Sequence, residues 1–252
     1  MGTHSVASAL SEGVPARAVF VAAESSSAIP ESITQAAALR GVPVRKAPRR
    51  DLDRWSEGAA HQGVALEVAE YGYVGLERLL PPVTASPPLL VALDGVTDPR
   101  NVGAVARSAL AFGAHGLLLP ERRSAGVSPA AWKTSAGALA VLPVARVVNL
   151  TRALRRCQQE GLTVLGLAGG AAQVLYDVDR TLLTDGVCLV VGSEDTGMSR
   201  LVSETCDMVV AVPVDKRTES LNVSVAAALA LSEVARARRA ERAERAPRPD
   251  SG

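Results

Sequence analysis

Residues 89–235 alternate short apolar runs with amphipathic stretches, and this alternation constrains the fold more than any other feature of the chain. Leu89–Leu93 is apolar throughout, as expected of a strand that is buried on both faces of a parallel sheet. Segments with helical spacing separate it from further apolar runs, at residues 116–119, 163–167, 187–191 and 208–212. Strands that alternate with helices of about 10–15 residues predict an α/β domain with a parallel sheet.

A smaller unit precedes this domain, at residues 1–70. The spacing of its apolar residues predicts two helices, over 6–10 and 32–40, and three strands, over 18–22, from about 44, and over 63–68. Strand, helix and strand within so short a segment indicate a compact α/β unit.

Proline marks the boundary between the two units. The prolines between residues 81 and 88 fix φ and lack a backbone donor, so residues 71–88 are predicted to form an extended linker. The larger domain is expected to span residues 89–240. We expect the last helix to fray near its end and residues 241–252, which are rich in arginine, to form a disordered tail.

The charges of the chain nearly cancel, which limits the partners that it can bind. With 27 Lys+Arg against 26 Asp+Glu, the formal net charge of +1 excludes a uniformly basic nucleic-acid binder but not a locally basic face. The hydrophobic share of 48% excludes a disordered protein. One basic cluster is compatible either with RNA binding or with a solvated loop; it consists of Arg45, Lys46, Arg49 and Arg50.

Several kinds of site are not expected. No apolar run reaches the roughly 18 residues of a membrane span, and no secretory signal is visible. Cys157, Cys188 and Cys206 form neither a CxxC pair nor a Cys/His cluster, so we expect buried free thiols and no metal site. These observations predict a cytoplasmic protein that binds neither a membrane nor a metal ion.

A polar turn follows the first strand of the larger domain and is the first candidate for a binding site. Asn101 is placed to cap the next helix, and Arg107 lies within its second turn on an otherwise small, apolar face. A charge on such a face needs a partner, and ligands of open α/β sheets bind at the carboxyl ends of strands. Taken alone, the segment is explained at least as well by a capped helix with a salt-bridged arginine.

Two further strand ends have similar features. Gly192 permits close approach of a ligand to the backbone, and Glu194 makes the same loop acidic. Because the chain contains neither GxxxxGK[ST] nor GxGxxG, this loop favours a cation, a hydroxyl or an amine over a phosphate. Ser220 is placed to cap the last long helix, with Asn222 in its first turn. Taken singly, a tight turn and an ordinary capped helix explain these features as well.

Together the three segments are far more specific than any one of them, and they resemble the motifs of a known family. Asn101-x-Gly-Ala-x-x-Arg107, Gly192-x-Glu194-x-x-Gly197 and Ser220-Leu221-Asn222-Val-Ser-Val-Ala are similar, in order and spacing, to the three motifs of the SpoU (TrmH-type) RNA 2′-O-ribose methyltransferases. Gly2-x-His4-x-Val6 and His61-Gln62-Gly63-Val64 resemble a subgroup that has a small ribosomal-protein-like RNA-binding domain in front. Within the family, the chain is most similar to the 23S rRNA guanosine 2′-O-methyltransferases.

The resemblance implies a fold, an assembly and a cofactor. Residues 89–240 would form an α/β parallel-sheet SPOUT domain with a deep trefoil knot, assemble as a homodimer and bind S-adenosylmethionine, and residues 1–70 would bind the RNA substrate. By the same resemblance the cofactor would lie among three strand-end loops, at Leu167, Ala168, Gly169, Gly192, Val212 and Leu221. Bare backbone groups beside apolar walls suit the adenine and ribose of such a cofactor.

The resemblance also implies the reaction, 2′-O-methylation of a ribose in structured RNA. Arg107 matches the catalytic arginine of the family, for which a role as general base has been proposed. Because a guanidinium stays protonated in proteins, holding the adjacent phosphate and stabilising the developing alkoxide is physically easier. The supporting polar residues of the family match Asn101, Glu194, Ser220 and Asn222.

Other functions remain open at this point. The motifs do not distinguish an rRNA from a tRNA substrate, and antibiotic-resistance methylases share them. A non-catalytic RNA-binding relative is disfavoured by the intact set of polar motif residues. A nucleotide-binding α/β enzyme of another kind is disfavoured because dinucleotide and phosphate-loop signatures are missing.

Overall fold

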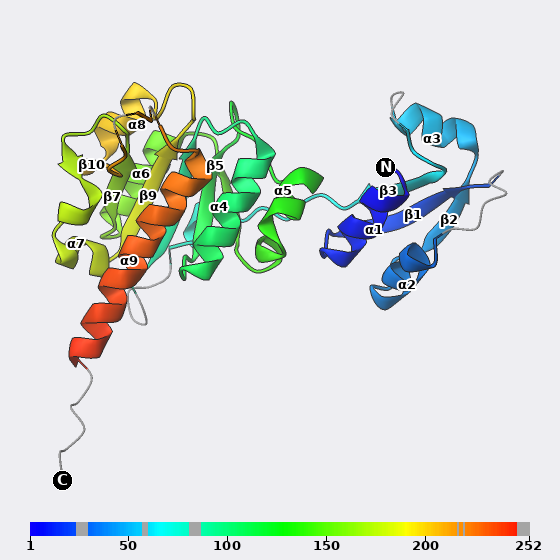
Figure 1. The fold of residues 1–252 in the computed structure, drawn as a ribbon, viewed down its shortest axis with the longest axis horizontal. Helices are drawn as coiled ribbons and strands as arrows, with labels where there is room; N and C mark the ends of the chain where they lie inside the picture. Colours follow the sequence, from blue (N-terminus) through cyan, green and yellow to red (C-terminus); the bar gives the residue numbers. More distant parts are fainter. Residues whose placement is uncertain (24–29, 57–59, 81–86, 216, 219, 246–252) are drawn as a thin grey trace, which may run out of the picture.

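The computed structural model describes residues 1–23, 30–56, 60–80, 87–215, 217–218 and 220–245, which form two units joined by an extended segment (Figure 1). In the N-terminal unit a three-stranded sheet has the order β2-β1-β3, with β2 parallel and β3 antiparallel to β1. Its elements are α1 (Thr3–Ser11), β1 (Ala16–Ala22), α2 (Glu31–Leu39), β2 (Val44–Ala47), α3 (Arg49–Ser56) and β3 (Val64–Val68).

The alternation of side chains along β1 explains how this unit packs. Val19 and Val21 face α1 and α2 and are buried against apolar residues such as Leu10 and Ile33. Phe20 and Ala22 face the other side, which α3 covers through Leu52. The sequence pattern predicted α1, α2 and the strands but not α3, in which charged residues outnumber apolar ones.

The segment expected as a linker is ordered over much of its length. Residues 71–80 contain a short 3-10 helix (η1, Leu76–Arg78), and Val74 forms a parallel bridge with Ala145. Leu79 is 1% exposed, and Tyr71 packs edge-on against Trp132. The linker prediction was therefore wrong for residues 71–80, because apolar side chains between the prolines and glycines pack on the larger domain. Residues 81–86 lie outside the described residues.

The larger domain confirms the predicted parallel sheet. Seven strands have the order β6-β5-β4-β9-β7-β10-β8, and every neighbouring pair is parallel. The strands are β4 (Leu89–Asp94), β5 (Gly116–Pro120), β6 (Val144–Val147), β7 (Thr163–Leu167), β8 (Gln173–Val174), β9 (Val187–Gly192) and β10 (Met208–Ala211).

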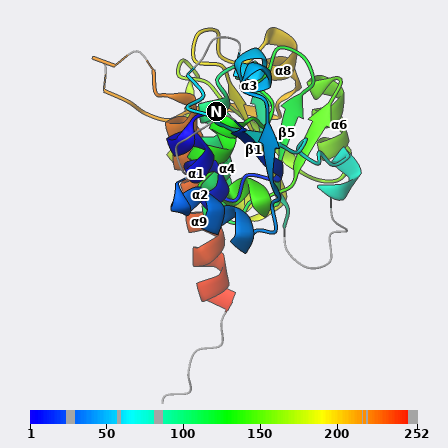
Figure 2. The ribbon, with the colours of Figure 1, turned by 90° about the vertical axis from the view of Figure 1, so that its right-hand side faces the viewer.

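Helices cover both faces of this sheet (Figures 1 and 2). Leu89, Val91 and Leu93 of β4 face the core beneath α4, α5 and α9, whereas Leu90 and Ala92 face the core beneath α6 and α8. Burial on both sides explains why the strand is apolar from Leu89 to Leu93. The helices are α4 (Pro99–Ala111), α5 (Pro129–Ser135), α6 (Leu150–Gln159), α7 (Arg180–Thr184), α8 (Arg200–Thr205) and α9 (Val223–Arg245), with η2 (Ala138–Ala140) and η3 (Leu175–Asp177) between them.

The caps of helices α4 and α9 differ from those expected. Asp98, not Asn101, caps α4, because Pro99 begins the helix and the Asp98 side chain accepts from Arg100 N at 2.8 Å. The cap of α6 is Asn149, whose side chain accepts from Arg152 N at 2.9 Å. At α9 the side chain of Asn222, not that of Ser220, accepts from Ser224 N, at 2.9 Å. Asn101 is therefore free for other contacts.

The last helix is longer than predicted. α9 continues to Arg245, so residues 241–245 are helical where a disordered tail was expected. An ion pair between Glu241 and Arg245 joins successive turns, and Glu244 pairs with Arg180, the first residue of α7. These contacts and the alanine-rich sequence favour continued helix. Residues 246–252 lie outside the described residues.

No helix in the described part of the chain is long and apolar enough to cross a membrane. No group of three or more His, Cys, Asp or Glu side chains among the described residues could hold a metal ion. The cysteines are free, as expected; Cys157 and Cys188 are buried and Cys206 is partly buried.

His115 gives the fold a pH dependence that can be measured. Its Nδ1 accepts from Leu89 N at 3.1 Å, and burial, with the nearby charge of Arg238, lowers the pKa of the ring below its usual 6.5. The unfolded chain then binds this proton more readily, so stability falls as the pH drops through about 6.5. We expect His115→Asn, whose side-chain oxygen can replace the acceptor, to reduce this fall in urea unfolding between pH 7.5 and 5.5. An identical decline in both proteins would contradict the prediction.

Candidate active site

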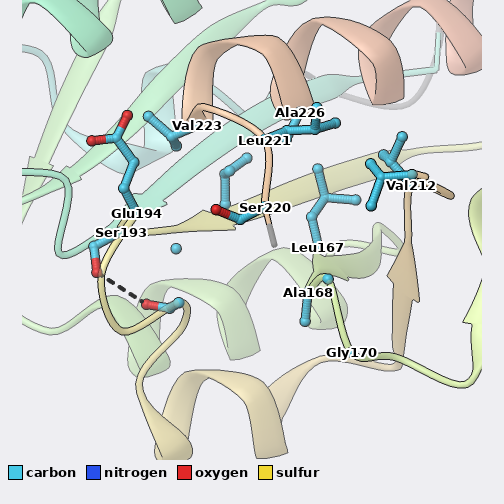
Figure 3. A pocket seen from close by; sticks show the side chains of 15 residues that line it. Leu167, Ala168, Gly170, Ser193, Glu194, Val212, Ser220, Leu221, Val223 and Ala226 are labelled. Carbon is cyan, nitrogen blue, oxygen red and sulfur yellow. Dashed lines mark hydrogen bonds between the residues drawn. The ribbon is translucent and has the colours of Figure 1, made fainter. Parts of the chain in front are cut away.

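A cavity of about 320 Å³ opens at the carboxyl ends of β7, β9 and β10 (Figure 3). Leu167 at the end of β7, Val212 just after β10 and Leu221 before α9 give it apolar walls. Gly169 and Gly170 lie at its edge, and an added Cβ at either would meet nothing within 4 Å. All the residues expected to bind a cofactor line this cavity, namely Leu167, Ala168, Gly169, Gly192, Val212 and Leu221.

Three polar side chains from distant parts of the chain form a cluster beside the cavity. Asn101 of α4 donates through Nδ2 to Glu194 Oε1 at 2.9 Å. Asn222 donates through Nδ2 to the same carboxylate oxygen and to Asn101 Oδ1, the latter at 3.2 Å. Asn101 is 9% exposed, so these bonds also satisfy a buried amide. We call this the Asn101–Glu194–Asn222 cluster.

The backbone around Gly192 explains how Glu194 is positioned. Ser193 N donates to Gly197 O at 3.1 Å and Gly197 N to Ser193 O at 3.0 Å, which closes a tight hairpin after β9. A Cβ on Gly192 would lie 2.1 Å from backbone atoms of Gly197 and Met198. Only glycine fits at this position, and the hairpin carries Glu194 to the rim of the cavity.

Of the remaining candidate residues, Ser220 lines the cavity and Arg107 does not. Ser220 is exposed and lines the cavity. Arg107 lies on the exposed face of α4, six residues after Asn101, and does not line the cavity. Within the part of the chain that the structure describes, no carboxylate pairs with Arg107. The salt bridge considered for this arginine is therefore absent there, and its charge is available to a ligand.

The predicted basic cluster lies in the N-terminal unit, apart from the cavity. Arg45 and Lys46 are exposed on the edge strand β2, and Arg49 and Arg50 are exposed in the first turn of α3. They lie on regular elements, not on the solvated loop that was the alternative. Next to them, Phe20 and Trp55 form an aromatic pair with ring centroids 5.1 Å apart.

One residue that supports the site was not among the predicted ones. Asp94, the last residue of β4, accepts from Ser199 N at 2.6 Å through Oδ2 and so fixes the far end of the Glu194 loop at the start of α8. The available signal was an acidic residue that directly follows an apolar strand and precedes a glycine.

Family models match nearly the whole chain. The SpoU rRNA Methylase family matches residues 88–232, and a model described as RNA 2′-O ribose methyltransferase substrate binding matches residues 1–74. The chain belongs to the SpoU rRNA methylase family. It is an S-adenosylmethionine-dependent RNA methyltransferase, as the resemblance of its three motifs implied.

Relatives and solved structures that match most of the chain support this assignment. A protein of Mycobacterium ulcerans (strain Agy99), named "Uncharacterized tRNA/rRNA methyltransferase", is 49% identical over 241 residues, which cover 94% of this chain and 76% of the relative. The crystal structure of the SpoU methyltransferase AviRb from Streptomyces viridochromogenes in complex with AdoMet is 26% identical, with a TM-score of 0.68 over 94% of this chain and 89% of AviRb. A putative RNA methyltransferase of the TrmH family from Porphyromonas gingivalis is 28% identical, with a TM-score of 0.64 over 93% of this chain and 88% of that one.

The cavity of this SpoU methyltransferase fits its cofactor on geometric grounds. Its volume of about 320 Å³ lies within the range of small-molecule sites, about 300–1,000 Å³. Apolar side chains form walls suited to an adenine ring, and the open glycines expose backbone donors and acceptors. The carboxylate of Glu194 at the rim favours a cationic group over a phosphate.

Proposed function

We propose that this SpoU methyltransferase methylates the 2′-oxygen of a ribose, in a guanosine of 23S rRNA. The observation that carries the proposal is the Asn101–Glu194–Asn222 cluster, which places a hydrogen-bonded carboxylate at the mouth of the cofactor cavity. The family model on residues 1–74 and the similarity of the motifs to the rRNA guanosine enzymes support the choice of substrate. Because RNA of this kind resides in the cytoplasm, we place the enzyme there.

The cluster can orient the substrate hydroxyl. S-adenosylmethionine, when bound, supplies a methyl group on a positively charged sulfur. The side-chain amides hold Glu194 through Oε1, and among the described residues no bond engages its Oε2, which can accept from the ribose hydroxyl. Ser220 lines the same cavity and can donate to the substrate. Fixing this hydroxyl in line with the methyl group removes part of the activation free energy, and the carboxylate of Glu194 can take the hydroxyl proton as the 2′-oxygen attacks.

Arg107 supplies the positive charge in this proposal. It is exposed and carries a planar fork of donors that suits the phosphate next to the target ribose. From there it stabilises the negative charge that develops on the 2′-oxygen. We assign it no role as general base, because its guanidinium holds its proton.

We further propose a homodimer, with the deep knot of the family. The support for the dimer is a group of exposed apolar side chains on the adjacent helices α4 and α9, namely Leu110, Val225 and Leu229. Leu110 lies three residues after Arg107 on α4, so a second copy seated there would also approach Arg107. The path of the chain after β10 supports the knot. β10 lies near one edge of the sheet, and the chain then returns so that α9 packs on α4. Sedimentation equilibrium tests the dimer, and a monomer at micromolar concentration would contradict it.

The test of the function is a search for the product. Unmodified 23S rRNA and tRNA transcripts are incubated with the enzyme and S-adenosylmethionine, digested to nucleosides and analysed by mass spectrometry. We expect 2′-O-methylguanosine from the rRNA alone. The same nucleoside from tRNA alone would establish the alternative substrate, a base-methylated nucleoside would overturn the proposed reaction, and no product from either RNA would favour a non-catalytic relative.

A further inference from the structure

Arginines line a second groove, at the β6 edge of the sheet and separate from the cofactor cavity. This groove has a volume of about 740 Å³ and runs along α6 beside η1. Arg146 of β6 lines it together with Arg152, Arg155 and Arg156 of α6. Residues three or four apart share one face of a helix, so the cations of α6 form a stripe along the groove.

Part of this positive charge is available to a ligand. Arg156 pairs with Glu160 at 2.6 Å and with Glu77 at 3.8 Å. Arg152 and Arg155 are exposed, and no ion pair involves their side chains within the described part of the chain. Two uncompensated guanidinium groups on one helix face form a local anion-binding surface in a chain whose formal net charge is only +1.

Arg146, near the carboxyl end of β6, is held in place by two contacts. Its guanidinium lies 5.0 Å from the centre of the Tyr73 ring, and Nη2 donates to Glu121 O at 3.2 Å. These contacts leave other donors of its fork open to solvent, since Arg146 is an exposed residue. A pre-oriented guanidinium loses less freedom when it binds a phosphate.

Further arginines continue from the groove toward the active site. Arg122 and Arg123 are exposed in the loop after β5, and Arg123 has a φ of 57°, which is unusual for a residue other than glycine. The loop is tied to β6 through Glu121 N and Val147 O, at 2.9 Å, and to the turn before α4 through Ala125 N and Val96 O, at 2.8 Å. These contacts hold Arg123 in its strained backbone conformation. Residues with such backbone strain are concentrated at functional sites.

The sheet relates the groove to the active site. All strands are parallel, so the ends of β6, β5, β4 and β9 lie on one rim, with the groove at β6 and Glu194 beyond β9. Neighbouring strands are about 4.8 Å apart, so β6 and β9 are about 14 Å apart. A few nucleotides span this distance.

We propose that these cations bind the phosphodiester backbone of the RNA that flanks the target nucleotide. We call them the rim arginines; they are Arg122, Arg123, Arg146, Arg152 and Arg155. Several guanidinium groups along one path can bind successive phosphates of an RNA strand. Contacts of this kind do not distinguish between bases. This inference rests on the proposed function, because it extends the RNA site from the N-terminal unit to the catalytic domain.

The test is the double variant Arg152→Gln/Arg155→Gln, which removes two charges and keeps hydrogen-bonding side chains. On unmodified 23S rRNA transcript at 0.1 M salt, we expect KM to rise about tenfold or more with kcat unchanged. In filter binding, the affinity for the same transcript should depend less steeply on salt concentration. Each phosphate contact contributes about 0.7–0.9 to the slope of log K against log salt, so the loss of two contacts flattens the slope. Calorimetry should give an unchanged affinity for S-adenosylmethionine.

Arg239→Gln/Arg242→Gln is the matched control. Both residues are exposed on the far part of α9, where no ion pair involves them among the described residues, and their replacement removes the same charge. We expect wild-type KM and salt slope.

Arg123→Gly is a further variant. It removes a cation and at the same time relieves the strain of the left-handed backbone, because glycine adopts a positive φ readily. A raised KM in this variant would therefore not reflect misfolding.

The outcomes separate this inference from the proposed function. A wild-type salt slope and KM in the Arg152/Arg155 variant would overturn the inference and leave the proposed function standing. Equal losses in this variant and in the Arg239/Arg242 control would also overturn it, because net charge alone would then explain the effect. If wild-type protein methylates neither RNA, the proposed function fails, and the binding slopes still decide whether the rim arginines contact phosphates.

Discussion

Arg107→Ala is expected to lower kcat for methyl transfer by about 10²–10³-fold, the loss that follows removal of one group that stabilises developing negative charge. The fold should be unaffected, because Arg107 is exposed and forms no ion pair in the described part of the chain, and such surface substitutions change stability by about 0.5 kcal/mol or less. S-adenosylmethionine binding should also persist, because Arg107 does not line the cofactor cavity. Transfer of a labelled methyl group to 23S rRNA transcript, with calorimetry and thermal unfolding, measures all three.

Arg100→Ala is the control for this substitution. Arg100 lies seven residues earlier on α4, is equally exposed and therefore presents the same charge on nearly the same face. We expect its kcat to match the wild type. Arg107→Lys should resemble Arg107→Ala, because an ammonium group cannot reproduce the planar fork. Full activity of Arg107→Ala, or an equal loss in Arg100→Ala, would refute the assigned role.

Gly192→Ala is expected to weaken the binding of S-adenosylmethionine by a factor as large as the loss of kcat in Arg107→Ala. The new Cβ would meet the backbone of Gly197 and Met198 at 2.1 Å, and backbone atoms cannot move aside as a flexible side chain can. The hairpin between Ser193 and Gly197 must open, which displaces Glu194 and the cavity wall. We expect the affinity for S-adenosylmethionine to fall at least 100-fold in calorimetry, with a destabilisation of about 1–3 kcal/mol in urea unfolding.

Gly169→Ala tests whether this effect is specific to the hairpin. Gly169 lines the same cavity, but a Cβ there would meet nothing within 4 Å. We expect wild-type stability and only a modest change in affinity. Tight cofactor binding by Gly192→Ala would show that the hairpin is not needed in its present form.

Local sequence patterns predicted the elements of the fold better than their arrangement. The apolar run at 89–93 could be recognised as a buried strand because both of its faces lie against helices. The order of the sheet could not be predicted, because β4 lies between β5 and β9 and the apolar pattern is the same for any neighbour. Short elements were missed for a related reason, since the four residues of β6 or the seven of α5 contain too few repeats to show a period.

The site was predictable only through the combination of motifs. Asn101 and Asn222 are 121 residues apart, and no local rule indicates that their side chains meet. The cap of α4 illustrates the limit. Asp98 and Asn101 are both suitable caps. Asp98 is the cap because Pro99 begins the helix, and because the side chain of Asn101 forms a hydrogen bond with Glu194 instead. The strained backbone of Arg123 and the stacking of Arg146 on Tyr73 arise from tertiary contacts that spacing does not reveal.

The side-chain bonds from α4 and the Glu194 loop to Asn222, at the start of α9, have a consequence for biosynthesis. Translation proceeds from the N-terminus, so a nascent chain has already made the sheet strands and most of the cofactor cavity before Asn222 leaves the ribosome. Until α9 emerges and docks, Glu194 lacks one of its amide donors and the cavity wall near Leu221 is missing. A translation product that stops before Asn222 would therefore lack this part of the proposed site.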